Sequence, residues 1–204
     1  MSKKPIIVFE GIEGSGKTFH LNNIARYLKK KRISFIKIRE PGGNYNSEKI
    51  RKLILNKKSN FNPTTDLLLY LAARNENINI LIKKYFKKKV ILIDRFVDST
   101  IAYQHYGMGV NLNLIKNINK VILRGIKVDF TFLNYVSNKN MKKRLLKRKN
   151  LNRYDRFNMK FYKKVQSGYF KISKQNKTKY FLVNSNLSIN ENKKNILKKI
   201  NKLI

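Results

Sequence analysis

Two kinds of hydrophobic pattern alternate along the chain. One is a short, unbroken apolar run, typical of a strand buried on both faces of a parallel sheet; the other spaces apolar residues three or four positions apart, which indicates an amphipathic helix. The apolar runs occur at residues 6–9, 35–38, 90–93, 130–133 and 180–183. Because helical patterns lie between these runs, we predict an α/β fold in which a five-stranded parallel sheet is flanked by helices on both faces.

The pattern also predicts how the second half of the chain is arranged. After Ser188, apolar residues at helical spacing follow a capping box formed with Glu191, so a closing helix should pack on the sheet. Residues 147–157 are polar and charged and lie between two helical stretches. They predict a mobile lid, and a solvated run of charge is the alternative.

Length and composition indicate one domain that spans residues 1–204, since the chain has neither an internal repeat nor a linker rich in proline, serine or glycine. Hydrophobic residues make up 42% of the chain, and no apolar run is long enough to cross a bilayer or to act as a secretory signal. The expected compartment is therefore the cytoplasm, with no membrane partner. The absence of cysteine excludes disulfides and thiolate metal sites.

The formal net charge of +36 is unusual and would ordinarily suggest a nucleic-acid partner. The lysines, however, are spread through every segment together with asparagine and isoleucine, the residues of A/T-rich codons. A nucleic-acid footprint is usually a localised patch. We therefore attribute the charge to base composition and expect no specific nucleic-acid partner, although an anionic substrate would be attracted.

The first strand leads into a motif that matches the phosphate-binding pattern G-x-x-x-x-G-K-[ST]. Its glycines allow successive backbone N–H groups to close round phosphate oxygens, and the following helix adds the positive end of its dipole. Lys17 would bridge the β- and γ-phosphates, and the Thr18 hydroxyl would bind the Mg²⁺ that accompanies them. The motif predicts a P-loop NTPase fold, with a glycine-rich turn as the alternative. Its residues are Gly11, Ile12, Glu13, Gly14, Ser15, Gly16, Lys17 and Thr18.

Charged residues also follow the second and third predicted strands. Arg39 opens the loop Arg39-Glu40-Pro41-Gly42-Gly43 at the carboxyl edge of the sheet, where ligands bind in open α/β folds. Asp94 ends the strand at 90–93 and is placed for a second magnesium contact, while Arg95 could aim its planar guanidinium at a phosphoryl group. The alternative for the glycine-containing loop is a simple turn.

Two further groups could bind a base or a sugar. Tyr70 and Arg74 are four residues apart on a predicted helix and could present a ring and a guanidinium to one ligand, although a weak surface cation–π pair is the alternative. The stretch from Ser99 to Gln104 carries hydroxyl and amide groups of the kind that read a base edge. Its polar members are Ser99, Thr100, Tyr103 and Gln104.

Taken together, these motifs resemble those of bacterial thymidylate kinases, in the same order and with matching separations. The resemblance rests on the run from Phe9 to Thr18, on Arg39-Glu40-Pro41-Gly42-Gly43, on the run from Tyr70 to Arg74, and on Asp94-Arg95-Phe96 with the stretch from Ser99 to Gln104. It is densest from residue 6 to about residue 110 and extends, more thinly, over nearly the whole chain.

The resemblance implies transfer of the γ-phosphoryl group of ATP to thymidine 5′-monophosphate (dTMP), with Mg²⁺, by a homodimer. By the same resemblance Tyr70 would stack on thymine, Arg74 would hydrogen-bond it, and Ser99, Thr100 and Gln104 would lie near it. Tyr103 would crowd the sugar 2′ position and Glu13 would lie by the 3′-hydroxyl. Arg95 and Arg39 would hold the acceptor phosphate. Since the nucleophile is already a phosphate oxygen, catalysis would consist of positioning and charge neutralisation.

In similar enzymes a catalytic arginine comes either from the phosphate loop or from the lid. The loop of this chain has Glu13 and Ser15 and no arginine, so the lid should supply the charge. Arg148 and Arg153 match best, with Arg156 in reserve.

Some positions depart from the family pattern. Asn134 and Asn184 stand at strand ends where aspartate is common, and Gln166 stands where arginine is frequent. The alternatives that remain open are a kinase for uridylate or cytidylate, a nucleic-acid-stimulated P-loop NTPase, and an inactive nucleotide-binding protein.

Overall fold

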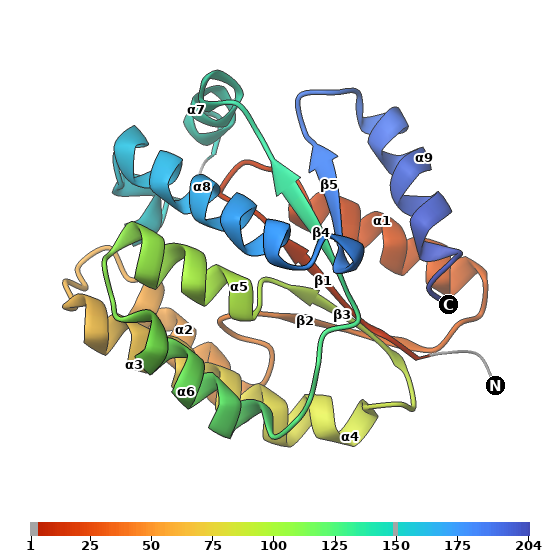
Figure 1. The fold of residues 1–204 in the computed structure, drawn as a ribbon, viewed down its shortest axis with the longest axis horizontal. Coiled ribbons are helices and arrows are strands. Elements are labelled where there is room, and N and C mark those ends of the chain that lie inside the picture. The colour runs from red at the N-terminus through yellow and green to blue at the C-terminus, as the bar shows by residue number, and fades with distance from the viewer. Residues whose placement is uncertain (1–3, 149–150) are drawn as a thin grey trace.

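Five parallel strands form the centre of the molecule. The computed structural model describes residues 4–148 and 151–204, and in it the sheet has the order β2-β3-β1-β4-β5 (Figure 1). The predicted fold class is confirmed, and each strand extends one or two residues beyond its apolar run. The strands are β1 (Ile6–Glu10), β2 (Phe35–Arg39), β3 (Val90–Asp94), β4 (Phe130–Tyr135) and β5 (Tyr180–Asn184).

Alternate residues of each central strand pack against different helices, because successive side chains of a strand point to opposite faces of the sheet. Ile7 and Phe9 of β1 lie in the core beneath α1 (Lys17–Lys30) and α9 (Ile189–Ile200). Ile6 and Val8 pack instead against α3 (Pro63–Asn77) and α6 (Leu112–Leu123). Both faces are therefore covered, as predicted, and the strands can be apolar throughout.

Of the remaining elements, α5 and α7 follow the carboxyl ends of β3 and β4, whereas α4 and η4 precede the amino ends of β3 and β5 (Figure 1). Two π-helical stretches, η1 and η2, continue α3 and α5, and a short 3₁₀ helix, η3, precedes α8. These elements are α2 (Tyr45–Leu55), η1 (Ile78–Ile82), α4 (Lys83–Tyr85), α5 (Val97–Thr100), η2 (Ile101–Gly107), α7 (Asn138–Leu146), η3 (Arg153–Arg156), α8 (Met159–Gln175) and η4 (Lys177–Lys179).

The predicted start of the closing helix is also found, and α3 begins with a similar side-chain cap. Asn62 caps α3 by accepting a hydrogen bond from the Thr65 backbone N–H, and Ser188 caps α9 by accepting one from Glu191. Each cap satisfies a donor that the helix itself leaves unpaired. Ile196 and Ile200 are buried under the sheet, so the closing helix packs as expected.

The predicted lid falls partly outside the described residues, which omit 149 and 150. The described part of residues 147–157 consists of a stretch after α7 and the helix η3. No helix among the described residues is long and apolar enough to cross a membrane.

Candidate active site

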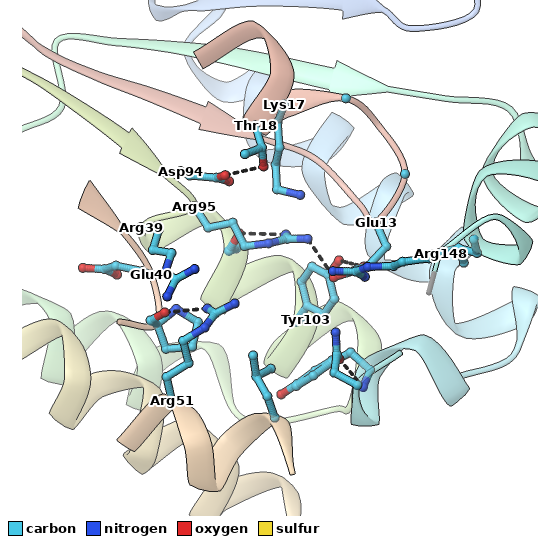
Figure 2. Close-up of a pocket in the computed structure, with 18 of the residues that line it drawn as sticks. Glu13, Lys17, Thr18, Arg39, Glu40, Arg51, Asp94, Arg95, Tyr103 and Arg148 are labelled. Atoms are coloured by element: carbon cyan, nitrogen blue, oxygen red, sulfur yellow. Dashed lines mark hydrogen bonds and ion pairs between the residues drawn. The ribbon is translucent and has the colours of Figure 1, made fainter. Parts of the chain in front are cut away.

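A cavity of about 300 Å³ opens over the carboxyl ends of β1 and β3 and is lined by residues from both halves of the chain (Figure 2). Residues of the P-loop form one side of the cavity, and residues of α2, α3 and η2 form the other. Its lining includes Glu13, Gly14, Gly16, Lys17, Thr18, Arg39, Glu40, Arg51, Tyr70, Asp94, Arg95, Ser99, Tyr103, Gln104, Arg144, Arg148 and Tyr154.

The P-loop turns between β1 and α1 with backbone torsions that require glycine. Gly11 has a φ of +137°, and a Cβ there would lie 2.1 Å from the carbonyl oxygen of Asn134 on β4. Gly16, with a φ of +82°, directly precedes Lys17, the first residue of α1. Gly16, Lys17 and Thr18 line the cavity, so the N-terminus of α1 lies at it, as an anion site at a helix N-terminus requires.

Lys17 is a buried cation in the middle of this cavity. Its residue is 9% exposed, and burial lowers the pKa of its ammonium group to about 8. The guanidinium of Arg95 acts in the same direction, whereas Asp94 and Glu13 oppose it. A polyphosphate at the loop would favour the charged form, because it would bring negative charge next to this ammonium group.

Thr18 and Asp94 meet at the start of α1. The Thr18 hydroxyl donates a hydrogen bond of 2.5 Å to the Asp94 carboxylate, so the two predicted magnesium ligands share one position (Figure 2). Hydroxyl and carboxylate oxygens are ligands that Mg²⁺ prefers, and its other ligands in nucleotide sites are usually water and phosphate. Among the described residues no group of three or more His, Cys, Asp or Glu could hold a metal ion.

Arg95 connects the P-loop to the opposite side of the cavity. It follows β3 with a φ of +67°, a left-handed conformation that is uncommon for a residue with a side chain. Its Nη1 donates to the Gly11 carbonyl at 2.8 Å and its Nη2 to the Glu13 carboxylate at 2.7 Å. The Tyr103 hydroxyl donates to the other Glu13 oxygen. Three of the predicted site residues thus form one network.

The electrostatics of this network favour its charged state. Burial alone would raise the pKa of Glu13, but the charges of Arg95 and Lys17 outweigh burial and lower it. Burial alone would lower the pKa of Arg95, but Tyr103 and Glu13 outweigh burial and raise it. A fixed, charged guanidinium is therefore present before any ligand arrives, which reduces the ordering that binding requires.

Two further arginines lie near Arg95. Arg39 lines the cavity and pairs with Glu48 at 3.0 Å, with its side chain 56% exposed. Arg51, on α2, lines the cavity too and donates to the Pro41 carbonyl at 2.6 Å. The sequence analysis missed Arg51, since its only signal was a basic residue on the helix that follows the Gly42-Gly43 turn.

The residues predicted to hold a base do not all lie on the cavity surface. Tyr70, Ser99, Tyr103 and Gln104 line it, whereas Arg74 and Thr100 are not among the lining residues. Of the residues predicted to bind the acceptor, Tyr70, Ser99, Tyr103 and Gln104 therefore form part of the cavity surface. Arg74 and Thr100 lie behind that surface.

Arg74 is only 1% exposed, which makes it far more buried than its place beside the apolar stripe of α3 predicted. Its Nε donates to Glu40 at 2.8 Å, its Nη1 to Asn119 at 2.8 Å and its Nη2 to Thr100 at 2.9 Å. All three nitrogens have protein partners. The surface cation–π pair considered as an alternative is therefore wrong, while contact between Arg74 and a base stays a prediction.

The arginines near the lid have different surroundings. Arg148 lines the cavity and pairs with Asp155 at 2.7 Å, with its side chain 46% exposed. Arg153 pairs with the buried carboxylate of Asp66. Arg144, which the sequence analysis did not single out from the basic helix, donates to the carbonyls of Gly14 and Ser185, both at 2.7 Å.

The fold and the cavity define a class of protein. A P-loop phosphotransferase has to bring a nucleoside triphosphate and a second anion together. The cavity has the parts that this requires: a P-loop able to surround phosphate, a Thr–Asp pair suited to Mg²⁺, and several arginines.

Comparisons with known proteins identify the family. The thymidylate kinase family profile matches residues 9–196. Thymidylate kinases of Prochlorococcus marinus and Thermosipho africanus are each 38% identical to the chain; the alignments cover 96% and 90% of this chain and 98% and 90% of the relatives. A crystal structure of thymidylate kinase from Ehrlichia chaffeensis superposes with a TM-score of 0.79 at 31% identity, covering 97% of this chain and 98% of that one. The chain belongs to the thymidylate kinase family.

Membership confirms the predicted reaction class at the level of the family: an ATP-dependent phosphotransferase that acts on dTMP. The alternatives of a uridylate or cytidylate kinase and of a nucleic-acid-stimulated NTPase are not favoured.

The buried position of Arg74 leads to a prediction about stability. Arg74→Met keeps the volume but leaves the Glu40 carboxylate buried without its cation, which should lower the free energy of unfolding by about 3–5 kcal/mol. Urea denaturation at neutral pH measures the loss. Arg39→Met, which breaks the exposed pair with Glu48, is the matched control and should cost less than about 1 kcal/mol. Equal losses in the two variants would contradict a structural role for the buried pair.

Proposed function

We propose that the chain transfers the γ-phosphoryl group of ATP to dTMP and so produces dTDP. One observation carries this proposal: Lys17, the Thr18–Asp94 pair and Arg95 line the same cavity. Aromatic and amide side chains line the rest of that cavity. Two nucleotides can meet end to end there, with the donor on the P-loop and the acceptor against Arg95. The product would serve dTTP synthesis.

On the donor side, the backbone amides of residues 11–18 would surround the phosphates of ATP, and Lys17 would contact the β- and γ-phosphates. Thr18 and Asp94 would hold Mg²⁺, Asp94 commonly through water, while the ion neutralises phosphate charge. The 2.5 Å contact between their oxygens supports this assignment, because both groups are directed to one point.

On the acceptor side, Arg95 would hold the phosphate of dTMP, with Arg39 and Arg51 nearby. The left-handed backbone of Arg95 and its bonds to Gly11 and Glu13 fix the guanidinium beside the P-loop, which supports this role. The attacking phosphate oxygen needs no base to remove a proton. The protein's contribution is thus alignment and charge neutralisation.

The base and sugar would lie against the cavity surface formed by Tyr70, Ser99, Tyr103 and Gln104. Tyr70 would stack on thymine, Gln104 and Ser99 would lie along its edge, and Tyr103 with Glu13 would contact the sugar. Arg74 and Thr100, bonded to each other at 2.9 Å, would support this surface from behind, and Arg74 would reach the base only if it exchanged a protein partner for it.

Arg148 is the stronger of the two candidates for the catalytic lid arginine. Its side chain lines the cavity and is 46% exposed, whereas the side chain of Arg153 is 12% exposed and is not among the lining residues. An arginine that stabilises the charge of the transferring phosphoryl group can contribute about 10³–10⁵ in rate. Arg153 would then fix the lid rather than take part in transfer.

We also propose a cytoplasmic homodimer that has no nucleic-acid or membrane partner. Leu114 and Val121, seven residues apart on α6, are 39% and 72% exposed, and Leu68 is 50% exposed on α3, which packs against α6. Apolar side chains exposed on adjacent helices suit an interface between two copies.

The substrate assignment predicts that the purified protein releases ADP fastest with dTMP when each deoxy- and ribonucleoside monophosphate is offered in turn. A coupled ADP-release assay measures this. Lys17→Ala should lower kcat by orders of magnitude while the circular dichroism spectrum stays unchanged, since Lys17 lines the cavity and the change removes a charge that burial already disfavours. Faster turnover of UMP, CMP or AMP would overturn the substrate assignment.

The position of Tyr103 predicts sugar discrimination. Tyr103→Ala should relax the preference for dTMP over its ribose analogue clearly, because the ring that crowds the 2′ position is lost, whereas Tyr103→Phe should relax it only slightly. The ratio of kcat/KM for the two acceptors is the measurement. An unchanged ratio in both variants would remove Tyr103 from the sugar site.

The dimer proposal predicts a sedimentation-equilibrium mass of twice the 24.2 kDa of one chain. Placing aspartate at both Leu114 and Val121 should shift the protein to monomer, because two charges would be buried without partners. Leu187→Asp, at a loop residue that is 47% exposed, is the control and should leave the mass unchanged. A monomeric parent protein would refute the proposal.

A further inference from the structure

The second half of the lid segment is anchored in the core. Tyr154 of η3 is only 3% exposed, and its backbone carbonyl accepts a hydrogen bond of 2.6 Å from the Tyr162 hydroxyl. Its ring makes edge contacts with Tyr70 and Tyr103 at centroid distances of 6.1 and 5.8 Å. All three tyrosines line the cavity, so a residue of the lid segment forms part of the acceptor end.

One buried carboxylate holds this arrangement together. Asp66 lies in the first turn of α3 and is 1% exposed. Its Oδ1 accepts a hydrogen bond from Arg153, and its Oδ2 accepts from the Tyr154 hydroxyl and, at 3.1 Å, from Gln104 Nε2. Asp66 therefore joins η3 of the lid segment to α3 and η2, the two elements that provide Tyr70, Tyr103 and Gln104.

We propose that Tyr154, held by Asp66, forms one wall of the acceptor-base subsite, so that docking of η3 and binding of the acceptor nucleotide stabilise each other. This inference rests on the proposed function for the identity of the acceptor. A ligand that contacts only the docked arrangement shifts the equilibrium towards it. Conversely, the apparent affinity for that ligand falls in proportion to the docked fraction.

The contacts assign the effect to one substrate. Asp66 bonds to Gln104, and the ring of Tyr154 contacts the rings of Tyr70 and Tyr103. These residues lie on the proposed acceptor side, whereas the amides of the P-loop would hold the donor. Loss of docking should therefore weaken acceptor binding more than ATP binding. A merely structural anchor would instead lower the stability and leave the affinities for both substrates unchanged.

Two variants and one matched control test this. Tyr154→Phe removes only the hydroxyl that donates to Asp66, and Asp66→Asn removes the charge that holds Arg153. In the control, Tyr180→Phe, the lost hydroxyl donates to another carboxylate, that of Asp98, at 2.8 Å, and Tyr180 is not among the residues that line the cavity.

We expect KM for dTMP to rise about 10-fold in Tyr154→Phe and in Asp66→Asn, as it would if the docked fraction fell to about one tenth, with KM for ATP changed less than about twofold. In the parent protein, dTMP without ATP should protect residues 151–157 from hydrogen exchange. This protection should be reduced in both variants and retained in Tyr180→Phe.

Parent-like KM for dTMP and parent-like exchange protection in Tyr154→Phe would overturn the inference, and so would an equal rise in both KM values. The exchange measurement on Tyr154→Phe decides the matter even if Asp66→Asn does not fold. If the parent prefers another monophosphate, the dTMP assignment fails. The same comparison with the preferred monophosphate then tests the inference by itself.

Discussion

The ion pair between Arg95 and Glu13 holds the cavity in its shape. The two groups meet at 2.7 Å with side chains only 15% and 13% exposed, and Arg95 also donates to the carbonyl of Gly11. It joins the P-loop, which follows β1, to the loop that follows β3. Since β1 and β3 are adjacent, parallel strands, the sheet brings these ends together, and the left-handed backbone of Arg95 turns its side chain towards the P-loop.

The distribution of negative charge complements this pair. The chain has only 11 acidic residues against 47 lysines and arginines, yet many of the acids lie in or beside the cavity, where they hold arginines in fixed positions. Glu40 holds Arg74, Asp66 holds Arg153 and Asp155 holds Arg148. Breaking such a partly or fully buried pair leaves an uncompensated charge in the interior, which is strongly unfavourable. Although the chain as a whole carries an excess of positive charge, these arginines in or beside the cavity are therefore each neutralised by a carboxylate.

Several parts of the fold and the site could be predicted because their signals are local. The five strands follow from short apolar runs, and the P-loop from glycines and a lysine at fixed spacing. The pairing of Thr18 with Asp94 follows from one further fact, that strand ends of a parallel sheet meet at one edge. Arg51 and Arg144 could not be found in this way, because a single arginine on a helix has no local feature that separates it from other basic residues.

The sequence by itself determined the α/β class, the phosphate loop and the family, because hydrophobic period and motif spacing are properties of neighbouring residues. The tertiary structure alone decided which polar side chains are buried and which face the ligand. It placed Arg74 behind the cavity surface and gave Arg148 and Arg153 different carboxylate partners. It also allowed Tyr154 to donate a hydrogen bond to Asp66, which is 88 residues away in the chain. Such contacts depend on how distant helices pack over the sheet, and no local pattern encodes them.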